Sequence, residues 1–120
     1  MKTRTLYRPV GAAERTALEQ SRWTRFPPRL VGQPHFVPVR TRAYAERVAR
    51  EASASGASAY VTRFEVSRAF LDQYAVHVVG ERMHEEYRIP AEELEAFNDA
   101  IVGDIEVVSD YPSAGALRQA

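Results

Sequence analysis

The stretch MHEEYRIPAEEL, residues 83–94, organises this chain because a strand pattern gives way there to the start of a helix. Residues 84–89 alternate as in a strand, which predicts two opposite faces. One face carries Glu85, Tyr87 and Ile89, and the other carries His84, Glu86 and Arg88. Pro90 suits the first position of a helix, because its missing N–H would have had no partner there.

The four glutamates of this stretch differ in what their positions explain. Glu92 and Glu93 fall in the first turn of the expected helix, where the helix dipole favours them, so a structural role is sufficient. Glu85 and Glu86 have no such explanation, and either would be a candidate chemical carboxylate if it lay in a cleft. The alternative is a pair of solvated charges on an edge strand.

Length and composition indicate one globular domain. The chain has 120 residues, of which 45% are hydrophobic and 27% charged, and its formal net charge is zero. Such a chain has no overall field that would draw it to nucleic acid or to a membrane. The absence of cysteine excludes disulfides, thiol nucleophiles and cysteine-based metal sites. With no apolar run of transmembrane length and no signal-peptide pattern, we expect a cytoplasmic protein.

Metal binding is not expected either. The three histidines are His35, His77 and His84, and they lack the close helical pairing of a zinc-protease motif.

The periodicity of the chain predicts an α+β domain with a split, mostly antiparallel sheet and about three helices. Expected strands cover Thr3–Val10, His35–Val39, Ala59–Val66, Ala75–Val79 and Asp104–Val108, and expected helices cover Ala12–Gln20, 42–54 and 90–100. Gly103 is expected to end the last helix. The domain would span residues 1–110, and residues 111–120 would form a flexible C-terminal tail.

Residues 21–34 are expected to form an ordered loop. This loop contains the only tryptophan, Trp23, together with Phe26 and three prolines. Because Trp23 and Phe26 would be costly to leave in water, both should be at least half buried. Loops of this composition often carry function.

Four segments together resemble a family of small bacterial proteins labelled "ADP-ribosylation/crystallin J1". They are LYRPVG (6–11), FPPR (26–29), YVTRF (60–64) and EYRIPAEEL (86–94), and the resemblance extends up to Val108. Crystallin J1 itself belongs with the ADP-ribosylglycohydrolases, which are large, all-helical enzymes with metal-binding carboxylates. This chain is too short and too rich in strands for that fold, so the label implies little about activity.

The chain also resembles the ADP-ribosyltransferase fold. Small members of that fold begin with a strand of the type Leu-Tyr-(His or Arg) followed by a helix, and a late strand carries the catalytic glutamate. The resemblance implies that Arg8 holds NAD and that Glu86 is catalytic. Two features depart from the pattern: the Ser-Thr-Ser signature is replaced by residues 36–39, FVPV, and the Gln-x-Glu loop by residues 84–86, HEE.

Cleavage of the nicotinamide bond of NAD sets chemical requirements that this chain can meet. The reaction passes through an oxocarbenium-like cation, which needs a carboxylate, an arginine on the pyrophosphate and an aromatic ring on the nicotinamide. The candidates are Glu86, then Arg8 or Arg29, then Tyr7, Trp23 or Tyr60. Each also has a structural alternative. In the structural alternatives, Arg8 is a surface residue, Arg29 pairs with a carboxylate and Tyr60 lies in the core. His84, which could orient a substrate, would only hydrogen-bond a neighbour.

Three hypotheses follow. The first is an NAD-dependent ADP-ribosyltransferase-like domain with an unknown acceptor, in which Arg8 and Glu86 face each other across a cleft between the first and late strands. The second is a non-catalytic binding module of the same fold, with that cleft filled by Trp23 or Phe26. The third is a protein-partner module that uses an exposed loop at residues 26–28 as its contact.

Overall fold

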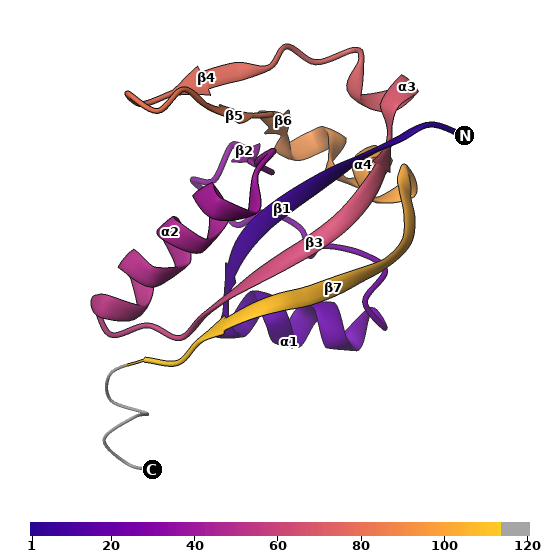
Figure 1. Ribbon diagram of the computed structural model, residues 1–120. Helices are drawn as coiled ribbons and strands as arrows, with labels where there is room; N and C mark the ends of the chain where they lie inside the picture. Colours follow the sequence, from indigo (N-terminus) through magenta and orange to yellow (C-terminus); the bar gives the residue numbers. More distant parts are fainter. Residues whose placement is uncertain (114–120) are drawn as a thin grey trace.

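A three-stranded antiparallel sheet forms the centre of the computed structural model, which describes residues 1–113 (Figure 1). Strand β3 (Ala59–Ser67) lies between β1 (Thr3–Gly11) and β7 (Ile101–Tyr111). Helix α1 (Ala12–Gln20) follows β1 directly, and helix α2 (Arg42–Ala54) precedes β3. The remaining elements are short. They are β2 (His35–Phe36), α3 (Arg68–Leu71), β4 (His77–Val79), β5 (His84–Glu86), β6 (Ile89–Pro90), the 3-10 helix η1 (Ala91–Glu93) and α4 (Leu94–Asp99).

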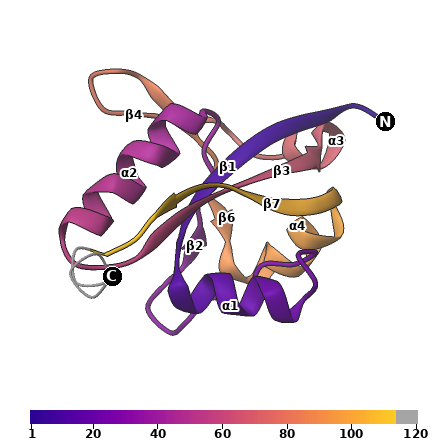
Figure 2. The same ribbon diagram turned by 60° about the horizontal axis from the view of Figure 1, so that its bottom comes forward.

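The two long helices cover opposite faces of the sheet (Figure 2). Alternate residues of β1 and β3 therefore enter two different cores. The larger core includes Leu18 of α1 and lies on the face that carries Leu6, Val10, Phe64 and Val66. The smaller core includes Ala45 and Ala49 of α2 and lies on the face that carries Ala59 and Val61. A side chain on β1 thus belongs to the α1 face or to the α2 face, and never to both.

A single residue, Val39, connects the central sheet to the β4–β5 ribbon. It exchanges two backbone hydrogen bonds of 2.8 Å with Tyr7 on one side and forms an antiparallel bridge to Glu86 on the other. The neighbouring bond from Arg40 N to Glu85 O, at 3.0 Å, extends this contact. Directly paired residues project to the same side of a sheet, so Tyr7, Val39 and Glu86 all face α2.

Most expected elements are confirmed. The first strand, the first two helices and the strand that begins at Ala59 lie within one residue of their expected bounds, and every strand pair in residues 1–113 is antiparallel. Thr41 caps α2 by accepting a hydrogen bond from Tyr44 N at 3.3 Å. The expected faces of residues 84–89 are also found, since Tyr87 and Ile89 enter the larger core.

Several boundaries differ from expectation. The strand expected over His35–Val39 ends at Phe36, the strand expected from Ala75 begins at His77, and the last strand is longer than expected at both ends. The strand over residues 84–89 breaks after Glu86, and Pro90 belongs to β6 and precedes η1 instead of starting an α-helix. Gly103 does not end a helix, because α4 ends at Asp99 and β7 runs through Gly103 to Tyr111. Gly103 has a φ of +80° and lies where the β3–β7 register shifts, so it forms a bulge in a continuous strand.

Tyr111, which was expected to begin the tail, belongs to the central sheet. Tyr111 is still in β7 and pairs with Ala59, whereas residues 114–120 lie outside the described part of the chain.

The loop over residues 21–34 is ordered by one buried side chain. Asn98 of α4 accepts a hydrogen bond from Phe26 N at 2.9 Å and donates one to Phe26 O at 3.0 Å. The Phe26 ring is 2% exposed and lies 4.8 Å from Phe36 and 4.9 Å from Phe64, between ring centroids. Trp23 is partly buried against the same core. The expected burial of both aromatic residues is confirmed, and the loop belongs to the core.

Replacing Asn98 with Ala should lower the free energy of unfolding by about 2–4 kcal/mol, because a buried N–H and a buried C=O of Phe26 both lose their partner. Urea denaturation measures this loss. The neighbouring variant Asp99→Ala removes an exposed partner of Arg25 and should cost under about 1 kcal/mol. A loss below about 1 kcal/mol for Asn98→Ala would show that the loop does not depend on this contact.

Candidate functional site

Arg8 is fully engaged on the α1 face of the sheet. Its Nε donates to Glu14 Oε2 at 2.7 Å and its Nη2 donates to Glu14 Oε1 at 3.0 Å. The guanidinium also lies 4.5 Å from the centroid of the Phe36 ring. Both charged side chains are mostly buried, with 12% and 18% of their surfaces exposed. Such a bidentate pair leaves Arg8 little capacity to hold a further ligand.

Arg29 lies near this pair, and within residues 1–113 it forms no ion pair or side-chain hydrogen bond of its own. Its Nε atom is buried and makes no hydrogen bond within residues 1–113. Burial lowers the pKa of Arg29, and the positive charge of Arg8 lowers it further, whereas Glu14 acts in the opposite direction. Arg29 thus lies close enough to Arg8 and Glu14 for their charges to interact, although Glu14 forms its ion pair with Arg8.

The other two predicted site residues, Tyr7 and Glu86, lie on the opposite face. Glu86 is 9% exposed, and its Oε2 accepts a hydrogen bond from Arg88 Nε at 3.1 Å. The expected arrangement, with Arg8 and Glu86 facing each other across a cleft, differs from the one observed. Val39 fills the space between their two strands, and the alternation of β1 directs Arg8 away from Glu86.

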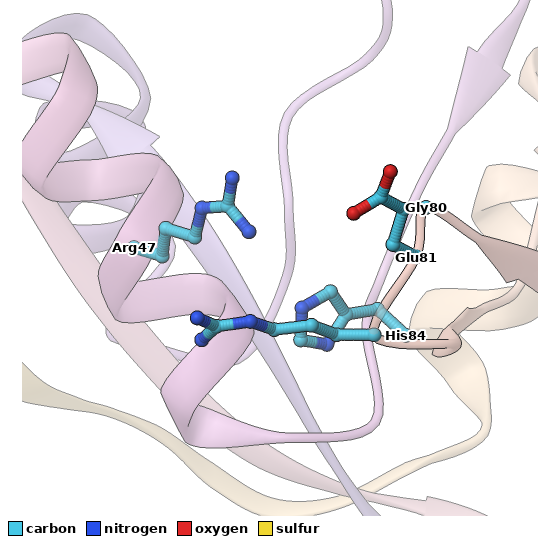
Figure 3. Close-up of a pocket in the computed structure, with 5 residues that line it drawn as sticks. Arg47, Gly80, Glu81 and His84 are labelled. Carbon is cyan, nitrogen blue, oxygen red and sulfur yellow. The ribbon is translucent and has the colours of Figure 1, made fainter.

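A cavity on the α2 face forms a site that the sequence did not predict (Figure 3). Its volume is about 520 Å³, and its lining comes from one helix and one hairpin. The lining residues are Arg47 of α2 and Gly80, Glu81, Arg82 and His84 of the β4–β5 hairpin. In Figure 3 Arg47 reaches out from α2 toward the hairpin, where Glu81 and His84 face it.

The β4–β5 turn places the charged residues of the hairpin at this cavity. Met83 N donates to Gly80 O at 3.1 Å, which closes a tight turn. Gly80 and Met83 have φ values of +74° and +53°, a conformation that glycine adopts readily and that few other residues adopt. The turn therefore holds Glu81 and Arg82 between two positions of left-handed backbone.

His84 is held in place by a ring stack with Tyr44 of α2. The two ring centroids are 4.1 Å apart and the ring planes differ by 3°. The Nε2 atom of His84 is buried and has no hydrogen-bond partner in the described part of the chain. A buried polar atom without a partner destabilises the protein by about 1–3 kcal/mol, so a ligand that hydrogen-bonds to it gains that free energy.

The charges around the cavity are mixed. Arg47 forms an ion pair with Glu51 at 3.3 Å, but both side chains are more than half exposed, so this pair contributes at most about 1 kcal/mol and Arg47 can turn toward a ligand. Arg82 forms no ion pair within residues 1–113. Two guanidiniums, one carboxylate and one imidazole suit a ligand that combines an anionic group with hydroxyl groups.

Sequence reasoning singled out only His84 among these residues. A signal for the hairpin residues is Gly80, which follows one expected strand and comes four residues before the next; this spacing is typical of a hairpin turn and would place Arg82 close to His84. No sequence pattern connects Arg47 to the hairpin residues, because Arg47 belongs to a helix more than thirty residues earlier in the chain. The described residues contain no group of three or more side chains arranged to hold a metal ion, and no helix among them is long and apolar enough to span a membrane.

Comparisons with family models, with curated proteins and with solved structures find no match to this chain. The site is therefore interpreted from its own geometry.

Replacing Glu14 with Gln should destabilise the fold by about 2–4 kcal/mol, because it leaves Arg8 and Arg29 together without a carboxylate. Thermal or urea unfolding measures the effect, and Glu19→Gln, which alters an exposed pair with Arg15, is the matched control. The double variant Glu14→Gln with Arg29→Gln should recover part of the loss. If it is no more stable than the single variant, the two guanidiniums do not repel each other.

Proposed function

We propose that this protein is a binding module for a nucleotide that carries ribose and phosphate groups, and that the ligand occupies the cavity between α2 and the β4–β5 hairpin. The observation that carries the proposal is that Arg47, Arg82 and His84 line one cavity, while the Nε2 of His84 is buried and has no hydrogen-bond partner within residues 1–113. A cavity of about 520 Å³ falls in the range of small-molecule sites, roughly 300–1,000 Å³.

Each lining group matches a part of such a ligand. Arg47 and Arg82 would bind phosphate oxygens, since guanidinium groups pair with phosphate in a bidentate way. Glu81 would accept hydrogen bonds from ribose hydroxyls, and its negative charge favours a sugar phosphate over a bare phosphate ion. His84 Nε2 would hydrogen-bond the sugar or a phosphate oxygen. NAD and ADP-ribose are the ligands of this class that the sequence resemblance suggests.

The order of elements supports an ADP-ribosyltransferase-like architecture as part of this proposal. The Leu-Tyr-Arg strand β1 is followed by α1, and the late strand β5 carries Glu86. The filling of the space around Arg8 favours the binding module over the enzyme. Phe36 and Glu14 occupy the surroundings of the guanidinium that would otherwise hold NAD, and Phe26 packs against Phe36.

Replacing His84 with Phe should weaken NAD or ADP-ribose binding about tenfold, because the ring stack on Tyr44 is kept while the Nε2 hydrogen bond is lost. Isothermal titration calorimetry measures the change. Arg82→Gln should weaken binding to a similar extent, and Arg50→Gln, an exposed position on α2 outside the cavity, should not. Undetectable binding by the wild type, or equal affinity in His84→Phe, would contradict the proposal.

Transfer of ADP-ribose from NAD to an unknown acceptor is the second candidate function. The observation that favours it is the position of Glu86, which lies on the same face of β5 as His84, roughly 7 Å along the strand. Its carboxylate is mostly buried and is oriented by Arg88. In this scheme Glu86 would hold a ribose hydroxyl and offset the positive charge of the oxocarbenium-like transition state. Arg47 and Arg82 would then bind the phosphate groups of NAD, which is the role that the resemblance assigns to Arg8.

If the protein cleaves NAD, Glu86→Gln should remove most of the rate and leave NAD affinity nearly intact, since an amide keeps the hydrogen bond but not the charge. Nicotinamide release measures the rate. Glu85→Gln is the control, because Glu85 points to the other face of β5 and pairs with Arg40 at 2.7 Å. Full activity of Glu86→Gln would rule out this role.

A further inference from the structure

The loop that carries Arg29 continues into two exposed apolar residues. Leu30 is 71% exposed, and Val31 is as exposed as in an extended chain. A local turn holds them there, because Gln33 N donates to Leu30 O at 3.0 Å and Leu30 N donates to Gln33 Oε1 at 3.2 Å. The end of the loop is fixed by a 2.8 Å hydrogen bond from Ala91 N to Pro34 O. The apolar side chains therefore face outward on an ordered segment.

Arg29 directly precedes Leu30, and among the interacting charges of Arg29, Arg8 and Glu14 the positive charge exceeds the negative charge by one. Arg8 and Arg29 share the single carboxylate of Glu14, and both of its oxygens already accept hydrogen bonds from Arg8. Arg29 keeps a buried Nε–H with no acceptor within residues 1–113. An excess of one positive charge favours the approach of one negative charge to the guanidinium of Arg29.

We propose that Arg29, Leu30 and Val31 form a docking surface for a segment of a partner protein that presents a carboxylate next to an apolar side chain. The carboxylate pairs with Arg29, and the apolar side chain covers Leu30 and Val31. Charge complementarity supports a carboxylate, because a single excess positive charge matches a monoanion, whereas Glu14 repels a phosphate dianion more strongly. The preformed turn reduces the conformational entropy lost on docking.

This surface is separate from the cavity at His84 and does not depend on the function proposed there. Arg29 lies with Arg8 on the α1 face, and the cavity lies on the α2 face. The surface also replaces the contact that the sequence suggested at residues 26–28, because Phe26 is buried.

The test uses the whole chain and two matched probes, N-acetyl-leucyl-leucine with its free carboxylate and the same dipeptide as its amide. The Nε–H signal of Arg29 in proton–nitrogen NMR spectra reports binding. The free acid should shift this signal in a saturable way, and the amide should not. Arg29→Gln should abolish the saturable response of the amides of residues 30–33, while Arg22→Gln, an exposed arginine in the same loop, should retain it.

Two further binding measurements separate the apolar contribution to docking from the ionic one. The double variant Leu30→Ser with Val31→Ser should lower the affinity for the free-acid dipeptide about threefold and leave the affinity for acetate unchanged. Inorganic phosphate should bind less tightly than the free acid. The proposal is overturned if acid and amide shift the signals equally, if the acid produces no shift, or if phosphate binds more tightly.

Discussion

The hydrogen bonds between the Asn98 side chain and the Phe26 backbone are the contact on which much of this structure depends. They join residues 72 positions apart and satisfy a buried N–H and a buried C=O in a segment that has no regular secondary structure. With Phe26 held there, its ring fills the space between Phe36 and Phe64. On either side of Phe26, Trp23 O accepts the 2.7 Å hydrogen bond from Ile105 N at the bulge of β7, and Arg29 lies within electrostatic range of Arg8 and Glu14. The core of the α1 face thus fixes a loop that also carries charge.

Val39 provides the second constraint, because it separates two groups of candidate site residues. Its pairing with both Tyr7 and Glu86 makes the β4–β5 ribbon an extension of the central sheet. Arg8 and Arg29 then belong to the α1 face, and the cavity lined by Arg47 and His84 belongs to the α2 face. The proposed nucleotide site and the proposed docking surface therefore lie on different faces, so binding at one would not block the other.

Local pattern predicted much of the fold, and long-range contacts explain what it missed. The alternation over residues 84–89 predicted that Tyr87 and Ile89 share one face and that Glu86 lies on the other, since the period of a strand depends only on neighbouring residues. The structure adds that the face of Tyr87 and Ile89 enters the larger core. The bridge at Val39 could not be predicted, because a single paired residue leaves no periodic signal. Gly103 was expected to end a helix, but its bulge is stabilised by a carbonyl at Trp23, about eighty residues earlier. Arg8 and Glu86 were matched by resemblance, and only the register of Val39 shows that they point apart.

The central claim is that the ligand site lies on the α2 face. The most direct test is to map backbone amide shifts of the wild-type chain during titration with ADP-ribose. The account predicts saturable shifts at Arg47 and at residues 80–84, with the amides of Arg8, Arg29 and Phe36 unchanged. Shifts centred on Arg8 and Arg29, or no saturable shift at any residue, would contradict it.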